Sequence, residues 1–325
     1  MSFLLRNVKS HKLLIGAPLL LFYLILVISP ILYTATYSVL RTDSRTSNNE
    51  RYEVKARKGD NVDNLKSHKL TLSGYENAMN DDEFWETVYE SIIYTIICVF
   101  GQLVLGMISA YIIERAIYLK LNTYFLLIAF FIPYAVPTSI VVLMWNFLLL
   151  KDGIFAQFMA YFGVNPNIWK SDLLFYSLVF ISIWEFFPFV FLAIYARMRK
   201  ISNSIYQTSI LDGASNLKIF RRITLPIIKS SLIVITLLRI AFMFSKFDLP
   251  LMFAENNAND KVRLAATFLV KNVASTEKMT NQFAKSMIVA FIVALIIMTI
   301  YFMFYVSTFI NPAKWLKRLK TIFVK

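Results

Sequence analysis

The sequence predicts an all-α integral membrane protein with six transmembrane helices. Of the 325 residues, 58% are hydrophobic and 16% are aromatic, which is more apolar surface than a soluble domain of this length can bury. A helix needs about 20 mainly apolar residues to cross a bilayer. Six stretches reach that length: 13–37, 88–113, 121–148, 173–196, 228–253 and 286–310. The basic residues lie mostly between them, which is typical of membrane proteins.

The first stretch, 13–37, follows Arg6, Lys9 and Lys12 and so resembles a signal peptide at its start. It is longer than the apolar region of a signal peptide, and no small-x-small cleavage site clearly follows it. We therefore interpret it as a retained first span.

The distribution of Lys and Arg predicts the orientation. Positive residues gather on the cytoplasmic side of membrane proteins, and the N-terminus, the segment after the fourth span and the C-terminal tail are strongly basic. The other loops have mixed charge, so six spans place both termini in the cytoplasm. The predicted organisation is a cytoplasmic N-terminus (1–12), a first helix (13–37), an extracytoplasmic loop (38–87), a five-helix core (88–310) containing a cytoplasmic loop at about 197–227, and a cytoplasmic tail (311–325).

The long loop at 38–87 changes character along its length. Its part from 42 to 69 is polar and poor in aromatic residues, as flexible loops are. Asp81-Asp82-Glu83-Phe84-Trp85 then combines acids with an aromatic anchor, a pattern that predicts the start of a helix at the membrane interface.

Several classes of function are disfavoured by the sequence. The net charge of +14 is not gathered on one polar face, so it indicates lipid headgroups as a partner and no nucleic acid. Cys98 is the single cysteine, so no disulfide and no Cys/His metal spacing is present. The sequence also lacks the phosphate-binding pattern G-x-x-x-x-G-K-[ST]. We therefore expect no catalytic residue, metal or cofactor on this chain.

The cytoplasmic loop between the fourth and fifth spans carries the most informative pattern. Residues 201–215 predict a short amphipathic helix, Gly213 suits a left-handed helix end, and Pro226 suits the start of the next helix. Small side chains at Thr208, Ser209 and Ala214 permit close approach of another surface. A short helix between two bends could therefore be seated in a groove of a soluble partner.

This loop resembles the EAA loop of ABC importer permeases, whose pattern is roughly E-A-A-x-x-D-G-A followed by I-x-L-P. The matching positions are Gln207, Thr208, Ser209, Asp212, Gly213, Ala214, Ile223, Leu225 and Pro226. The resemblance implies a type I importer permease whose coupling helix, between spans four and five, is moved by ATPase subunits. Gln-Thr-Ser departs from Glu-Ala-Ala, so an ion pair that the family makes through the glutamate is not implied here.

The resemblance extends over nearly the whole chain. Asp-Gly-Ala in the loop and the stretches 72–77 and 82–85 are similar to the carbohydrate branch, and to its maltose-permease F-type and glycerol-phosphate-permease A-type subunits. It implies a bacterial inner-membrane subunit that pairs with a second homologous permease, two ATPase subunits carrying ATP and Mg²⁺, and an extracytoplasmic binding protein that delivers the carbohydrate. The outer segment 254–260 departs from the T-x-G-G-P stretch common in the family.

Ionisable residues inside predicted spans are candidates for a solute pathway, because charge in a membrane is costly and usually faces a cavity or a partner. They are Glu185, Arg239, Lys246 and Asp248. Arg239 and Lys246 are seven residues apart, so a helix would place them on one face, about 10 Å from each other. Such a stripe would attract an acidic sugar or a sugar or glycerol phosphate. The alternative is that Arg239 pairs with Glu185 for packing and that Lys246 and Asp248 reach outward.

Aromatic residues supply a second group of candidates. Tyr134, Trp145 and Trp184 could stack on a sugar ring, although aromatic residues in spans commonly serve packing or the interfacial belt. Pro133, Pro137 and Pro188 are expected to kink their helices.

Other transport classes stay open at this stage. The sequence allows a permease for a non-carbohydrate solute such as a polyamine. A secondary transporter would need paired broken helices in related halves, a pattern that the sequence does not present. A membrane scaffold would need only the spans, leaving the Asp-Gly-Ala loop without a role.

Overall fold

The computed structural model describes residues 21–22, 24–41, 69–118, 122–163, 173–256, 263–273 and 279–309. This part of the chain is almost entirely helical, as predicted, with one short antiparallel pair of strands, Leu40–Arg41 (β1) and Lys69–Leu70 (β2), in which Leu40 faces Leu70. The chain divides into unit 1, Met1–Trp85 with Leu269–Phe291, and unit 2, Glu86–Phe268 with Ile292–Lys325. The predicted cytoplasmic ends, 1–12 and 311–325, lie outside the described residues.

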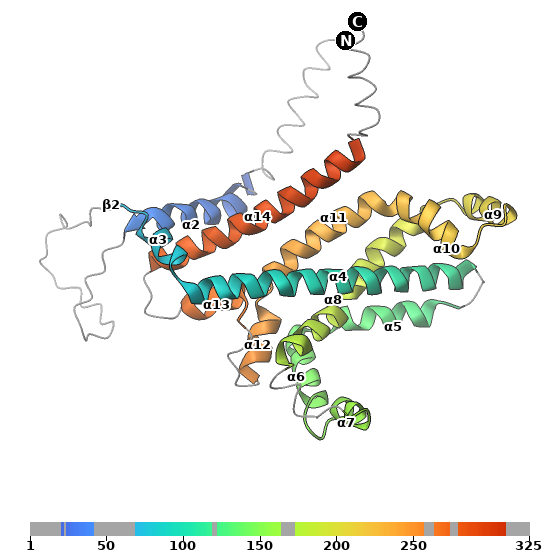
Figure 1. The fold of residues 1–325 in the computed structure, drawn as a ribbon, viewed down its shortest axis with the longest axis horizontal. Helices are drawn as coiled ribbons and strands as arrows, with labels where there is room; N and C mark the ends of the chain where they lie inside the picture. Colours follow the sequence, from blue (N-terminus) through green and yellow to red (C-terminus); the bar gives the residue numbers. More distant parts are fainter. Residues whose placement is uncertain are drawn as a thin grey trace, which may run out of the picture. The chain divides into compact units, whose positions relative to one another are not determined.

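The helices follow one another along the chain as labelled in Figure 1. They are the π-helix η1 (Leu24–Ile28), α2 (Ser29–Val39), α3 (Ser73–Met79), α4 (Asp82–Tyr118), α5 (Tyr124–Ala135), α6 (Thr138–Leu148), α7 (Ile154–Tyr161), α8 (Leu174–Met198), α9 (Asn203–Leu211), α10 (Asn216–Ile219), the π-helix η4 (Phe220–Thr224), α11 (Leu225–Phe244), α12 (Asp248–Asn256), α13 (Ala265–Val273) and α14 (Met279–Phe309).

Within the described residues, four helical segments are long and apolar enough to cross a membrane. They are Asp82–Ile117, Leu174–Met198, Asn216–Glu255 and Thr280–Phe304, and the α5–α6 pair makes up to five if it counts as one span. The described part of the first predicted span is the shorter apolar helix Leu24–Val39. The chain is therefore a multi-pass membrane protein, and the count of six spans stays a prediction.

The third predicted span, 121–148, is broken in the middle. Helices α5 and α6 meet at an angle of 98°. Val136 is extended (φ −82°, ψ 130°) because the ring of Pro137 disfavours a helical conformation of the preceding residue. Pro133 and Pro188, which were expected to act similarly, lie inside the helices α5 and α8. Each of these helices continues past its proline, although the proline lacks the N–H group that a helical hydrogen bond needs.

In unit 2, α4 and α8 approach each other closely along part of their length. A Cβ atom built on Gly106 of α4 would lie 2.9 Å from the backbone nitrogen of Phe191 in α8. A buried core in the same unit contains Cys98, Leu178 and Met243, from α4, α8 and α11. These three helices therefore form the framework that holds the charged residues described below.

In unit 1, polar contacts join α14 to the chain before α4. The ammonium of Lys285, whose side chain is 2% exposed, lies 2.6 Å from Oδ2 of Asp81. The amide of Asn77 donates to Oδ1 of Asn281 at 3.2 Å. The backbone N–H of Phe84 donates to Oδ1 of Asp81 at 3.0 Å and so caps α4. The helix start predicted from the acidic segment is confirmed.

The Asp81–Lys285 ion pair should make stability depend on pH. Burial raises the pKa of the Asp81 carboxyl, but the Lys285 ammonium and the Phe84 N–H lower it further, so the pKa lies below its ordinary value. A lowered pKa stabilises the folded state above the unfolded pKa of about 4 and loses this contribution as the pH falls through the folded value. In detergent, the melting temperature of the wild type should fall more between pH 6 and pH 3 than that of Asp81→Asn.

A second variant checks that the pair is the cause. Lys285→Met keeps a long unbranched side chain but removes the ammonium group that pairs with Asp81. The folded protein should therefore lose about 2 kcal/mol of stability at pH 7. Most of the pH dependence should disappear with it. Equal pH profiles for the wild type and both variants would show that the pair does not control acid stability.

Candidate functional site

Helix α9 occupies the place of the predicted loop helix and ends in a left-handed turn. Gly213 has φ +72°, as predicted from its position after the helix. Its N–H donates to the carbonyl of Ile210 at 2.9 Å, and the N–H of Ala214 donates to that of Ser209 at 3.0 Å. These two bonds make a Schellman motif, which closes the helix without using groups outside the loop.

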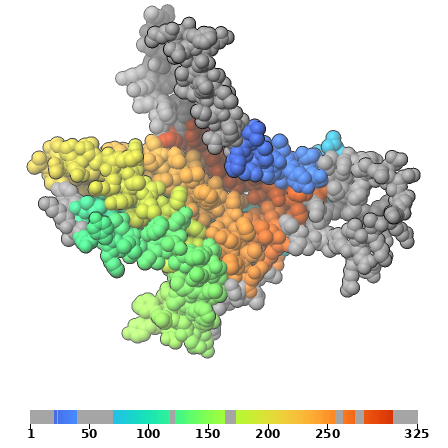
Figure 2. Space-filling model, turned by 180° about the vertical axis from the view of Figure 1, so that it is seen from behind, coloured from blue at the N-terminus to red at the C-terminus, as the bar shows by residue number. Residues whose placement is uncertain are grey.

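The α9 loop exposes apolar side chains. Leu211 is 87% exposed and Leu217 is 65% exposed. Of the predicted coupling residues, Gln207, Thr208, Asp212 and Gly213 are exposed, and Ser209 and Ala214 are half-buried. Figure 2 shows this segment, in yellow, with its side chains open on the visible face.

Beyond the loop, the chain enters one continuous helical segment. Oγ of Ser215 caps α10 by accepting from the N–H of Lys218 at 3.4 Å. Helices α10, η4 and α11 then follow without a break, and Pro226 lies in the first turn of α11, as predicted. The loop is thus joined rigidly to a helix of the core.

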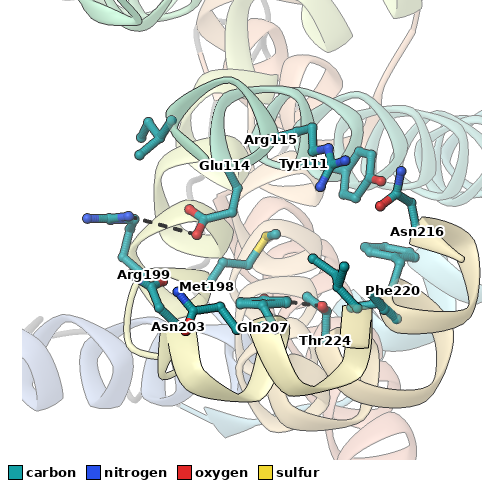
Figure 3. Close-up of a pocket in the computed structure, with 14 residues that line it drawn as sticks. Tyr111, Glu114, Arg115, Met198, Arg199, Asn203, Gln207, Asn216, Phe220 and Thr224 are labelled. Atoms are coloured by element: carbon teal, nitrogen blue, oxygen red, sulfur yellow. Dashed lines mark hydrogen bonds and ion pairs between the residues drawn. The ribbon is translucent and has the colours of Figure 1, made fainter. Parts of the chain in front are cut away.

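A cavity of about 420 Å³ lies beneath α9 (Figure 3). Its walls come from the ends of α4 and α8, from α9, and from α10 with η4. Nη1 of Arg199 lies 3.8 Å from Oε1 of Glu114, and the hydroxyl of Tyr206 lies 3.2 Å from that of Thr224. Gln207 also lines the cavity. The cavity places polar and aromatic groups directly behind the loop.

Two buried charges lie in the framework of unit 2. Glu185 in α8 and Arg239 in α11 are each 3% exposed. Nε of Arg239 donates to Oε1 of Gln102 at 2.8 Å, and Oγ1 of Thr138 donates to Oε1 of Glu185 at 3.1 Å. Arg239 therefore bonds to Gln102, and the direct ion pair with Glu185 that we considered is not formed. Within the described residues, Nη2 of Arg239 and Oε2 of Glu185 have no hydrogen-bond partner.

The second pair of predicted charges lies close by. Nζ of Lys246 is 2.9 Å from Oδ1 of Asp248, and the Lys246 side chain is 16% exposed. Helix α11 ends at Phe244, so the expectation that Arg239 and Lys246 share a helix face is wrong. The ring of Phe186 brings them together instead, with Arg239 Cζ 5.0 Å and Lys246 Nζ 4.5 Å from its centroid.

The three predicted aromatic residues join the same region through packing. The rings of Trp145 and Trp184 are 5.5 Å apart and nearly perpendicular. Trp145 is 6% exposed. The ring centroids of Tyr134 and Phe186 are 6.3 Å apart. The structure therefore brings the predicted pathway residues into one neighbourhood, with the tryptophans packed edge to face.

Sequence reasoning missed three members of this cluster: Gln102, Thr138 and Phe186. Gln102 is 0% exposed and its Nε2 donates to the carbonyl of Ser182 at 3.2 Å. A glutamine in the middle of the apolar stretch 88–113 is a signal that could have identified it. Thr138 and Phe186 carry no comparable signal, because both residue types are common in spans.

Comparisons with known proteins match this architecture. The family model described as binding-protein-dependent transport system inner membrane component matches residues 102–313. The trehalose/maltose transport system permease protein MalF of Thermococcus litoralis is 29% identical over 182 residues, covering 55% of this chain and 60% of the relative. The inner membrane ABC transporter permease protein YcjO of Escherichia coli K12 is 26% identical over 245 residues, covering 72% and 80%.

A further relative and a solved structure extend the comparison. The sulfoquinovosyl glycerol transport system permease protein SmoG of Agrobacterium fabrum is 28% identical over 208 residues, covering 62% of this chain and 67% of the relative. A chain in the crystal structure of a bacterial ABC transporter involved in alginate import superposes with a TM-score of 0.71 at 14% identity, covering 92% of this chain and 97% of that one. The likeness shows a shared fold.

Proposed function

Because this chain belongs to the family of binding-protein-dependent transport system inner membrane components, we propose that it is the permease subunit of an ATP-driven carbohydrate importer. The observation that carries the proposal is the exposed α9 loop, whose apolar Leu211 and glycine-closed end present a surface suited to a soluble partner. The names of the relatives support a sugar as the solute. A polyamine importer and a secondary transporter have no comparable support.

In this proposal, α9 transmits force from the ATPases to the spans. Two ATPase subunits bind ATP and Mg²⁺, and this chain supplies no catalytic residue. Their closure would push α9, and the continuous α10–η4–α11 segment would carry the displacement into the core. The residues that would contact the ATPase are Gln207, Thr208, Ser209, Asp212, Gly213 and Ala214, in a cytoplasmic loop flanked by basic residues.

The proposed assembly has further partners. A second homologous permease would complete the pathway, and a binding protein would deliver the solute on the extracytoplasmic side. Both termini of this chain would lie in the cytoplasm, because the 1–12, 197–229 and 311–325 segments are all basic. A solved alginate importer in complex with its periplasmic protein has a chain of the same fold, with a TM-score of 0.70.

The solute pathway would pass the buried charges. A buried polar atom without a hydrogen bond costs free energy, and a role at a functional site is one explanation for such an atom. Nη2 of Arg239 and Oε2 of Glu185 are therefore poised to contact a polar solute. A sugar hydroxyl can accept from the guanidinium and donate to the carboxylate. Tyr134, Trp145 and Trp184 lie in the same neighbourhood and would offer apolar faces to the ring.

The balance of charge in this cluster bears on the choice of sugar. Lys246 is paired with Asp248, and Glu185 and Arg239 have opposite formal charges, so the formal charges of the four side chains sum to zero. A neutral sugar needs no added countercharge here. A uronate or a phosphorylated sugar would have to compete with Glu185 for Arg239.

The experiment that tests the proposal is a reconstitution. The chain, its neighbouring permease and the ATPase are placed in proteoliposomes, and ATP hydrolysis stimulated by the binding protein is measured with neutral, uronate and phosphorylated sugars. Stimulation by at least one sugar class is expected. No stimulation by any sugar, with stimulation by a polyamine, would overturn the carbohydrate assignment.

The role of the α9 loop can be tested through Gly213. A β-branched residue is strongly disfavoured at φ +72°, so Gly213→Val should unwind the end of α9 and lower transport-coupled ATP hydrolysis at least tenfold. Gly163→Val is the matched control, because Gly163 has φ +80° and, like Gly213, no atom of the described residues within 4 Å of an added Cβ. Both variants are strained, but only one lies in the loop. Normal transport by Gly213→Val would contradict the coupling role.

A further inference from the structure

The cavity behind α9 contains a carboxylate whose charge is poorly compensated. Glu114, at the end of α4, has a side chain that is 15% exposed. Its Oε1 atom is 3.8 Å from Nη1 of Arg199, which is beyond hydrogen-bond distance. Its Oε2 atom is buried and has no hydrogen-bond partner among the described residues. The side chain of Arg199 is 46% exposed, so water screens this contact.

Such a carboxylate is stabilised by a closer cation. Charge-assisted hydrogen bonds between a carboxylate and a basic side chain are about 2.7–2.9 Å long and roughly twice as strong as neutral ones. An exposed pair at the observed distance contributes about 0–1 kcal/mol. Within the described part of the chain, the Glu114 carboxylate is thus largely buried without a strong cationic partner.

Besides Glu114 and two arginines, the cavity is lined by aromatic and amide groups that a basic side chain can contact. Tyr111 and Phe220 meet edge to face with their ring centroids 5.5 Å apart, and aromatic faces attract cations. Asn203, Gln207 and Asn216 add amide oxygens that accept hydrogen bonds. Among the described residues that line the cavity, Glu114 is the single carboxylate. Arg115 also lines it and is itself partnered.

We infer that Glu114 receives a lysine or arginine side chain of the ATPase subunit, inserted behind α9. The inference rests on the proposed function, because α9 forms one wall of the cavity and is the element that would meet the ATPase. Gln207 lines the same cavity but carries no charge. Glu114, which comes from a different helix, supplies the negative charge at this junction. Arg199 holds the carboxylate until the partner replaces it.

The first experiment measures association of the ATPase with the purified permease pair in detergent. Glu114→Gln keeps the shape of the side chain and removes its charge, so the dissociation constant should rise at least tenfold. Glu90→Gln is the matched control. Glu90 lies on the same helix and accepts a hydrogen bond from the backbone N–H of Arg263 at 3.3 Å, and it does not line the cavity. This control should bind the ATPase as the wild type does.

The second experiment moves the charge. Adding Gln207→Glu to the Glu114→Gln variant returns a carboxylate to the same cavity from α9, and most of the lost affinity should return. Arg199→Gln removes the competing cation and should tighten association by about two- to fivefold. A purely structural Glu114–Arg199 contact predicts the opposite: Arg199→Gln would then weaken association as Glu114→Gln does.

Each other outcome overturns the inference. Unchanged association for Glu114→Gln would show that no partner cation binds there. Failure of Gln207→Glu to restore affinity, together with a lower melting temperature of the isolated Glu114→Gln permease, would assign Glu114 to folding. If the wild-type permease pair does not bind the ATPase at all, the proposed function fails, and that result is distinct from failure at Glu114.

Discussion

Gly106→Leu is expected to prevent stable folding of the helical framework. A Cβ atom at this position would lie 2.8 Å from Cγ1 of Val190 and 2.9 Å from the backbone nitrogen of Phe191. The backbone of α8 cannot yield as a flexible side chain would, so α4 and α8 would be forced apart. Overpacking of this kind costs about 3 kcal/mol or more, and small residues at helix contacts are what permit such close approach in membranes.

The measurement is the yield of monodisperse protein in detergent and its melting temperature. Ile108→Phe is a suitable control, because Ile108 lies on the same helix and is 50% exposed. It adds volume at a side chain that is half exposed. A wild-type melting temperature for Gly106→Leu would show that α4 and α8 do not approach as closely as described.

Arg239→Ala is expected to lower sugar transport by about a hundredfold. It removes the guanidinium whose Nη2 has no hydrogen-bond partner among the described residues, and it leaves Oε1 of Gln102 without its donor. Loss of one charged hydrogen bond in a buried site corresponds to about 2–4 kcal/mol. Uptake of labelled sugar into proteoliposomes measures the effect, and ATPase association serves as the check that the complex still assembles.

Two further observations separate transport from packing. Arg239→Lys keeps the charge but not the planar fork, so it should recover part of the uptake. If Arg239→Ala and Arg239→Lys both assemble and transport normally, Arg239 serves only to pack against the rings of Phe186 and Phe189. If uptake of uronates is lost while neutral sugars still pass, the guanidinium recognises an acidic group.

Much of this architecture could be predicted because its signals are local. Apolar stretches, the acidic start of α4 and the glycine after α9 each act within a few residues, and the structure confirms them. The predicted resemblance to carbohydrate permeases of the maltose F type is also confirmed by the relatives. The roles of the coupling and pathway residues stay predictions.

The end of α11 shows where local reasoning was incomplete. The sequence predicts one span over 228–253, and this stretch lies within the candidate span Asn216–Glu255, but its helix is interrupted, because α11 ends at Phe244 and α12 begins at Asp248. An acid at the first position of a helix, followed two residues later by Pro250, is a start signal that the sequence offered. This start signal is easily missed, because the sequence is apolar both before and after it.

Other features depend on residues far apart in the sequence. Gln102 meets Arg239 across 137 positions, and Glu114 shares a cavity with Gln207. Helical periodicity assigns faces within one element and says nothing about which faces meet. Pro137 broke its helix and Pro133 did not, because the outcome depends on how neighbours satisfy the freed backbone groups.

Gly106 and Gly213 are required for different physical reasons. The two positions are therefore expected to tolerate different substitutions in related proteins. At 213 the requirement is on the hand of the backbone, with open space around the residue, so asparagine is an admissible replacement. At 106 the requirement is on volume, and the added Cβ would also lie 2.9 Å from the backbone nitrogen of Phe191, so a smaller side chain on the facing helix does not remove the clash. Position 213 can therefore vary, whereas position 106 is expected to stay glycine.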